Sequence, residues 1–358
     1  LKKRKRKETK IVKSDNRKTK KQKLNSWIGI VIMLVGAGIF FYPDLQSYLT
    51  NKEDAAIIQE FNEYTQEQQN VDEETEQTQA ENEPAFDIIE GTDELLGNIQ
   101  QYNSDIYANG QEDFKDAWTV AQTPVAVKEL QNGMFGYIQI PAMNCTLPLY
   151  IGASEKHMDK GAAVLGATSI PVGGENTNSV IAGHRGWKRG KYFKQIEKLS
   201  VGDKVYITNP WTTLKYKVES IDIIKPTDSD KVKIQDGKDM VTLVTCHPYR
   251  SHGKYRYVVY CVRDMSEDAA VSEEQDTGTD TENRQGQQTD DNYIPASDGN
   301  SYESSKTDIR TEELLRRGGA VVILFLAVLS IIVNIRRNIS SKSDVPEKTG
   351  ISNHIACK

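Results

Sequence analysis

The sequence DMVTLVTCHPY, residues 239–249, has the character of a buried β-strand that ends at a cysteine. Its β-branched and aliphatic residues run to Thr245, and Cys246, His247 and Pro248 follow. The whole chain has only four cysteines. Cys246 could therefore be a core residue, a metal ligand, one half of a disulfide or a nucleophile, and the neighbouring segments must decide between these alternatives.

Seven further segments have the same β-branched or alternating character and are separated by Gly, Pro, Asn and Asp turn residues. They predict eight strands within one outer domain, from Met134 to Asp264. Many short strands with such turns predict a mainly β fold, and a closed barrel is favoured because it leaves few open edges. Residues 192–199 predict one short helix. The seven further segments are 135–141, 145–152, 161–168, 178–186, 203–209, 214–225 and 254–263.

Two uncharged apolar runs flank this domain: WIGIVIMLVGAGIFFYP at 27–43 and GGAVVILFLAVLSIIVNI at 318–335. A helix of about 20 apolar residues crosses the hydrocarbon core of a membrane, so both runs predict transmembrane helices. The first run has no small-residue cleavage site, which predicts an uncleaved anchor. Residues 1–26 carry 13 basic and 2 acidic residues, and such clusters stay in the cytoplasm. We expect a two-pass protein of the cell membrane, with both termini cytoplasmic and the β domain extracellular.

The segments between these parts are polar. Apolar spacing around Phe61 and Ile99 predicts amphipathic helices before the β domain, whereas the stretch after it is acidic and has the composition of a tether. The net charge of −6 therefore combines a basic end, which we assign to lipid head groups rather than nucleic acid, with acidic outer linkers. The predicted order is a basic cytoplasmic segment 1–26, a transmembrane helix 27–43, a polar stalk with helices 44–133, the β domain 134–264, an acidic linker 265–317, a transmembrane helix 318–335 and a cytoplasmic tail 336–358.

Three residues with complementary chemistry lie at predicted strand ends. Cys246 ends one strand, His184 ends another in VIAGHRG, and Arg256 lies near the start of the last. A thiolate attacks a carbonyl, an imidazole moves protons, and a guanidinium stabilises an oxyanion, so these three side chains suffice for acyl transfer. A barrel that brings the three strand ends to one rim would assemble them.

The other interpretations of these residues stay open at this point. A lone buried cysteine is most often an inert core residue. A metal site is disfavoured, because the chain has no C-x-x-C pair and His247 and His252 do not form a familiar ligand spacing. Cys145 and Cys261 lie on predicted strands, where they either form a disulfide or belong to the core.

The segment TLVTC resembles the signature of the sortases, the surface transpeptidases of Gram-positive bacteria. Residues 136–186 also resemble the first half of the sortase barrel, and YRYVVYCVR resembles its last strand. The resemblance implies a closed eight-stranded sortase-type β-barrel. It also implies that Cys246 is the nucleophile, His184 the general acid/base and Arg256 the oxyanion-stabilising or substrate-positioning group. No metal or organic cofactor is implied.

The two apolar runs, the long segment before the barrel and PVGGENTNSV resemble class C, the pilin-polymerising sortases. Members of that class carry a lid with an Asp-Pro-aromatic motif. At the corresponding place this chain has Asp116, Ala117 and Trp118, so alanine replaces the proline. The resemblance implies a lid in which Asp116 pairs with Arg256 and Trp118 covers the thiol. A second departure is His247, which follows the cysteine where class C members have a Thr-Pro-Tyr segment.

The implied reaction cleaves an LPxTG-type sorting signal at the Thr–Gly bond through a thioester and transfers it to an amine, which in pilus assembly is a lysine of a second pilin. One alternative is a housekeeping sortase that transfers surface proteins to a cell-wall precursor. An alternative of another class is a non-catalytic extracellular β binding domain held by two membrane anchors, in which Cys246 is inert.

Overall fold

The computed structural model describes residues 2–71, 92–112, 114, 134–185, 192–250, 253–265 and 293–343. The chain divides into two compact units. One unit comprises Leu45–Arg310 and contains the β domain, and the other combines Leu1–Asp44 with Thr311–Lys358.

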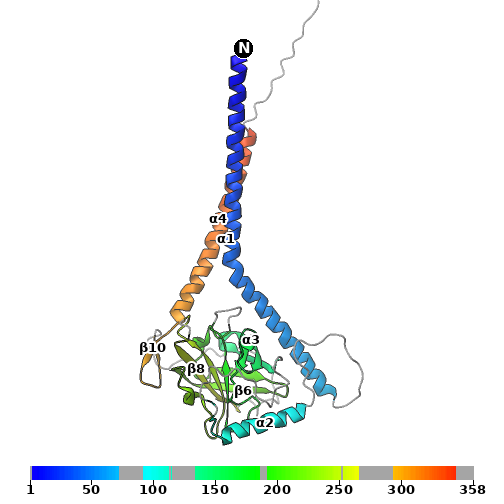
Figure 1. Cartoon of the computed structure of the whole chain (residues 1–358), viewed down its shortest axis with the longest axis vertical. Coiled ribbons are helices and arrows are strands. Elements are labelled where there is room, and N and C mark those ends of the chain that lie inside the picture. Colours follow the sequence, from blue (N-terminus) through cyan, green and yellow to red (C-terminus); the bar gives the residue numbers. More distant parts are fainter. Residues whose placement is uncertain are drawn as a thin grey trace, which may run out of the picture. The chain divides into compact units, whose positions relative to one another are not determined.

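The β domain is a closed barrel with the strand order β1-β2-β3-β4-β7-β8-β6-β5 (Figure 1). The eight predicted strands are confirmed. Two neighbouring pairs, β2 with β3 and β4 with β7, are parallel, and the other pairs are antiparallel. The strands are β1 (Gly136–Ile140), β2 (Cys145–Ile151), β3 (Ala162–Val164), β4 (Thr177–Ala182), β5 (Lys204–Thr208), β6 (Thr213–Ile224), β7 (Asp239–His247) and β8 (Tyr255–Arg263).

Strand β7 is buried on both faces, which explains its long apolar run. Val241 and Leu243 contribute to the main barrel core, whereas Met240 and Val244 belong to a second apolar cluster. Because successive side chains of a strand point to opposite faces, a strand covered on both sides reads as a continuous apolar run rather than an alternating one. Cys246 is the one exposed residue of β7.

Helices pack against the barrel from both predicted amphipathic segments. Helix α1 (Lys2–Val71) buries Phe61 against the barrel residues Met134 and Tyr150. Helix α2 (Thr92–Ala108) buries Ile99 in the main core, and Asn103 bonds both the backbone N–H and the carbonyl of Ile170, at 2.8 and 3.0 Å. The short elements of the domain are α3 (Glu155–Met158), η2 (Pro141–Met143), η3 (Ile196–Lys198) and η4 (Ser229–Val232).

Residues 192–199 differ from the predicted short helix. The structure forms turns followed by the three-residue 3-10 helix η3. The apolar residues Phe193, Ile196 and Leu199 are all buried in the main core. Their spacing of three residues matches the 3-10 repeat, so the segment uses the tighter turn to bury all three.

Helix α4 (Lys306–Ser343) contains the one stretch of the described residues that is long and apolar enough to cross a membrane, Lys306–Val333, with a mean hydropathy of 2.1. This stretch includes most of the second predicted transmembrane run. The first predicted run, residues 27–43, is helical as part of α1, but the side chains of residues 1–29 lie outside the described part of the chain. A second span therefore stays a prediction.

The acidic linker is not a tether over its whole length. Strands β9 (Tyr293–Pro295) and β10 (Ser301–Glu303) form an antiparallel hairpin, visible in Figure 1 at the β10 label. Tyr302 packs its ring 4.8 Å from the ring of Tyr255 on β8, and Asp222 on β6 accepts a hydrogen bond from the backbone N–H of Ser297 at 2.8 Å. We call residues 293–305 the C-terminal hairpin segment. Its few apolar and polar anchors suffice to order it, although its composition predicted a flexible chain.

Candidate active site

The strand register brings the three predicted catalytic residues to one end of the barrel. Cys246 on β7 is the cross-strand partner of Arg256 on β8. On the other side of β7, Ala182 of β4 pairs with Val244 in parallel register. Cys246 lies two residues beyond Val244 on β7, and His184 lies two residues beyond Ala182, in the loop after β4. The loop after β4, strand β7 and strand β8 thus contribute one residue each, and these three strands are neighbours in the barrel.

Cys246 and Arg256 face each other above Gly253. A methyl group added to Gly253 would lie 2.6 Å from Arg256 Nη1 and 3.2 Å from Cys246 Sγ, so glycine leaves the space in which the two side chains meet. Arg256 Nη1 donates hydrogen bonds to the carbonyls of Gly253 and Tyr255, at 2.7 and 3.3 Å. These bonds hold the guanidinium beside an exposed thiol, where it can stabilise negative charge.

His184 lies in the loop that follows β4 and is partly exposed. Its Nε2 lies 3.7 Å from Asp159 Oδ1, and its ring contacts the ring of Tyr192 edge-on. The Tyr192 hydroxyl donates a 2.6 Å hydrogen bond to the carbonyl of Asp159. The carbonyl of His184 accepts a bond from the Phe193 N–H at 3.0 Å. These contacts orient the imidazole.

Two hydrogen bonds hold the His184 loop against β7, one from a side chain and one within the backbone. Thr245 Oγ1 donates a 2.6 Å hydrogen bond to the carbonyl of Gly183, and the Gly183 N–H donates to the carbonyl of Val244 at 3.1 Å. The ring of Phe193 covers Gly183 so closely that an added Cβ would lie 2.7 Å from it. Thr245, which precedes Cys246, and Gly183, which precedes His184, therefore hold the backbone of both candidate site residues in place.

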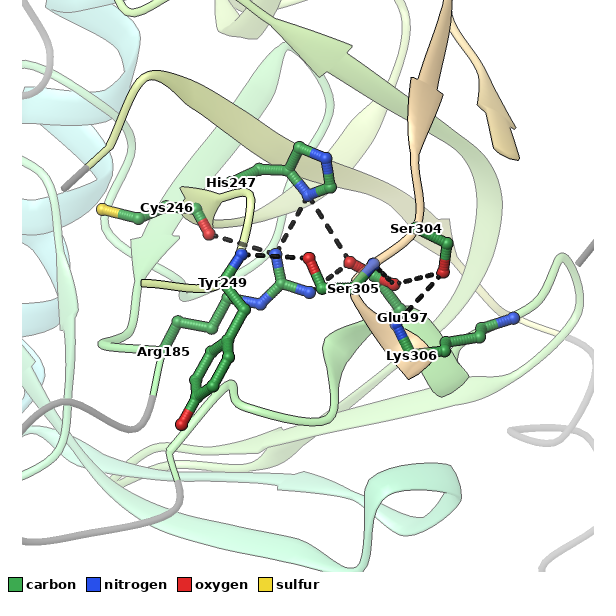
Figure 2. Close-up of polar contacts among 8 residues, drawn as sticks. All are labelled: Arg185, Glu197, Cys246, His247, Tyr249, Ser304, Ser305 and Lys306. Carbon is green, nitrogen blue, oxygen red and sulfur yellow. Dashed lines mark hydrogen bonds and ion pairs between the residues drawn. The ribbon is translucent and has the colours of Figure 1, made fainter. Parts of the chain in front are cut away.

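His247 is fully buried behind the cysteine. Its Nδ1 lies 3.0 Å from Arg185 Nη1 and 3.4 Å from Glu197 Oε1 (Figure 2). Arg185 pairs with Glu197 and also donates a 3.2 Å hydrogen bond to the carbonyl of Cys246. Figure 2 shows the thiol of Cys246 pointing away from these side chains. His247, whose place the sequence left unexplained, is thus part of the support of the cysteine turn.

The thiols of the barrel differ sharply in exposure. Cys145, Cys246 and Cys261 are free, so the disulfide alternative for Cys145 and Cys261 is wrong. Burial, with a smaller contribution from the charge of Asp54, raises the pKa of Cys145 to about 12. Burial also raises the pKa of Cys261, which packs in the main core. Among the described residues, Cys246 is the exposed thiol, and it is the one that lies beside a guanidinium.

Sequence reasoning missed Asp159 and Glu197. Asp159 follows the short exposed helix α3, and Glu197 lies in KQIEKL, where a charged residue is typical of a solvated face. Neither position carries a sequence signal, because each becomes functional only through a contact with a distant segment. The predicted lid residues Asp116 and Trp118 lie outside the described residues, as does His252.

Comparisons with known proteins identify the family of the β domain. Residues 138–264 match the family described as "Sortase domain". Sortase A of Bacillus anthracis is 30% identical over 182 residues, which are 49% of this chain and 83% of that protein. Sortase A of Staphylococcus aureus is 30% identical over 154 residues, 42% of this chain and 71% of that protein. A solved structure of Clostridium perfringens sortase C with a C-terminal cell wall sorting motif is 34% identical and covers 57% of this chain and 98% of its own, with a TM-score of 0.45.

The barrel, the exposed cysteine at the end of β7 and the two relatives that align over most of their length lead to one assignment. The chain belongs to the sortase family of cysteine transpeptidases.

Proposed function

We propose that this sortase uses Cys246 as nucleophile, His184 as general acid/base and Arg256 as oxyanion-stabilising group to join LPxTG-type proteins to an amine. The observation that carries the proposal is the register of β4, β7 and β8, in which Cys246 pairs with Arg256 and the loop with His184 leaves β4 beside the end of β7. The contact of Cys246 and Arg256 with the same small space above Gly253 supports it further.

The reaction has two acyl-transfer steps. The Cys246 thiolate adds to the carbonyl carbon of the threonine in the sorting signal, and Arg256 donates hydrogen bonds to the developing oxyanion. The Thr–Gly bond breaks, His184 gives a proton to the leaving glycine amine, and a thioester remains on Cys246. An acceptor amine then attacks the thioester, His184 takes up its proton, and the thiolate leaves as the new amide bond forms.

We propose a pilin lysine as the acceptor amine and therefore a role in pilus assembly. The support is the presence of a second apolar helix after the barrel and the long segment before it, the features by which the sequence resembles the pilin-polymerising class. A membrane-held enzyme meets membrane-held pilins at a raised effective concentration. The alternative acceptor is the amino group of a cell-wall precursor, which would make the protein a housekeeping sortase.

We also propose the two-pass topology, with the barrel outside the cell. In the unit that contains both apolar helices, Arg316 Nη2 lies 3.0 Å from Asp44 Oδ1. Arg316 precedes the second apolar run and Asp44 follows the first, so the pair belongs at one membrane face. A basic residue beside a membrane span favours the cytoplasmic side. Asp44 neutralises Arg316, so this arginine no longer argues against an extracellular position of the barrel.

The catalytic assignment is tested with the full chain in detergent and an LPxTG peptide. Cleavage should be lost in Cys246→Ala and retained in Cys145→Ala, which removes a half-buried thiol of the same barrel. Equal cleavage by Cys246→Ala and the unmodified chain would sink the assignment and leave the non-catalytic binding domain. In cells, deletion of the gene should remove SDS-resistant pilin ladders. Ladders that persist while monomeric surface proteins leave the wall would favour the housekeeping function.

A further inference from the structure

A buried polar cluster lies directly behind the cysteine turn and joins three distant parts of the chain (Figure 2). Arg185 comes from the loop after β4, Glu197 from η3, His247 from the end of β7, and Ser304 and Ser305 from the C-terminal hairpin segment and its end. We call these five residues the Glu197 cluster. None of them is needed as a reacting group in the proposed mechanism, so their burial requires another explanation.

Glu197 is the centre of the cluster. Its Oε1 pairs with Arg185, while its Oε2 accepts hydrogen bonds from Ser304 Oγ at 2.8 Å and from the Ser305 N–H at 2.9 Å. Burial by itself raises the pKa of Glu197, but the bonds and charge from His247, Arg185 and Ser304 outweigh it and lower the pKa to about 2. The side chain is therefore an anion that neutralises the buried Arg185.

The cluster costs desolvation energy, which argues against stability as its main purpose. Arg185, Glu197 and His247 are 5%, 3% and 0% exposed. Replacing a buried ion pair by apolar residues is often neutral or stabilising, so such pairs are weak evidence for a stabilising role. Apolar residues could not replace the directional hydrogen bonds, by which a guanidinium and a carboxylate fix the position of the groups that they bond.

The groups fixed here are the two ends of the turn that contains the nucleophile. Arg185 donates to the carbonyl of Cys246 at 3.2 Å, and Ser305 Oγ accepts from the Tyr249 N–H at 2.9 Å. Between these points, Arg185 Nη1 contacts His247 Nδ1. The same Nδ1 lies 3.4 Å from Glu197 Oε1, so the imidazole contacts both members of the buried ion pair. The backbone from Cys246 to Tyr249 is thus held from behind while the thiol faces outward.

We infer that Arg185 and Glu197 are positioning residues for Cys246, and that Ser304 and Ser305 lock them in place. The C-terminal hairpin segment, which lies beyond the last barrel strand, is then a working part of the catalytic domain. This inference rests on the proposed function of Cys246 as the nucleophile.

The test compares Glu197→Gln and the double variant Ser304→Ala/Ser305→Ala with the unmodified full chain in detergent. Ser301→Ala is the control for the double variant, because Ser301 is an exposed serine of the same hairpin. Glu219→Gln is the control for Glu197→Gln, since Glu219 pairs with Lys238 at the surface. The measurements are kcat and KM for an LPxTG peptide, the melting temperature, and the pH profile of Cys246 alkylation by iodoacetamide, resolved by peptide mass spectrometry.

Both variants should lower kcat by about tenfold or more, with KM within about twofold, because the reacting geometry is lost but peptide binding is not. Both variants should also change the alkylation profile of Cys246, because the backbone that holds its thiol is no longer fixed. The two controls should match the unmodified chain.

Unchanged kcat in both variants, or equal losses in the variants and their controls, would overturn the inference. A fall in melting temperature without a change in kcat or in the alkylation profile would overturn it too, because this is what a purely structural cluster predicts. Failure of the proposed function looks different, since Cys246→Ala would then cleave the peptide as well as the unmodified chain.

Discussion

Cys246 and Arg256 are direct partners across the β7–β8 ladder, and their side chains share the space above Gly253. Gly253 has a φ of +82°, in the region that favours glycine. Two reasons therefore favour glycine at this position. The backbone conformation disfavours a side chain, and the thiol of Cys246 and the guanidinium of Arg256 leave no room for one.

Gly253→Ala should lower kcat/KM by about tenfold or more, because the new methyl group displaces Arg256 from the thiol. Gly237→Ala is a matched control, since Gly237 also has a positive φ, +73°, but nothing within 4 Å of an added Cβ. Both variants should lose a similar amount of thermal stability, about 1 kcal/mol from the backbone strain. Equal catalytic losses in the two variants would show that strain, and not crowding at the site, is responsible.

Gly183→Ala should also lower kcat, by displacing the His184 loop. An added Cβ would lie 2.7 Å from the Phe193 ring, so the ring or the loop must move. The measurement is a double-mutant cycle on peptide cleavage. In the Phe193→Ala background, Gly183→Ala should have little further effect, since the obstructing ring is gone. Additive losses in the double variant would contradict this explanation.

The Glu197 carboxylate should make folding stability depend on pH in the acid range. The pKa of Glu197 is lowered from an ordinary value of 4.5 to about 2. Its stabilisation is fully present above about pH 4.5 and is lost as the pH falls towards 2, because the unfolded chain takes up the proton first. Thermal unfolding should show Glu197→Gln melting below the unmodified chain at pH 7, and the gap should narrow below pH 4.5. A gap that stays constant over this range would contradict the assignment.

Asp54 should show the opposite pH dependence. Burial, with the charge of Glu53 adding to it, raises the pKa of Asp54 from 3.8 to about 7. Ionising this carboxyl in the folded state is costly, so the domain should lose stability as the pH rises from about 4 to 7. Asp54→Asn should therefore raise the melting temperature at pH 8 and have no such effect at pH 3.5. Glu53→Gln, which removes the neighbouring charge but keeps the buried carboxyl, should give a smaller gain at pH 8. A gain of the same size at both pH values would rule out the titration as its cause.

The strands were predictable because their signals are local. Each strand is visible as a β-branched run between turns, and Cys246, His184 and Arg256 lie in or beside such runs. The amphipathic packing of Phe61 and Ile99 was predictable for the same reason, since helical spacing marks the buried face.

The supporting contacts were not predictable, because they join residues that are far apart in the chain. Glu197 contacts Ser304, which lies 107 residues away. The hairpin around Ser301 has too few apolar residues to be told from a tether by composition. The sequence marked His247 only as a residue that differs from the family pattern. The structure shows that it contacts the buried Arg185 and Glu197, which accounts for a histidine at this position without a role in the reaction.

Ser305 is followed immediately by Lys306, the first residue of α4, and its carbonyl accepts a hydrogen bond from the Ile309 N–H at 3.0 Å. The same serine bonds Glu197 through its backbone N–H and Tyr249 through its hydroxyl. The start of the C-terminal helix and the backbone that follows Cys246 are therefore tied to one residue, so a displacement of the helix start would also displace the cysteine turn.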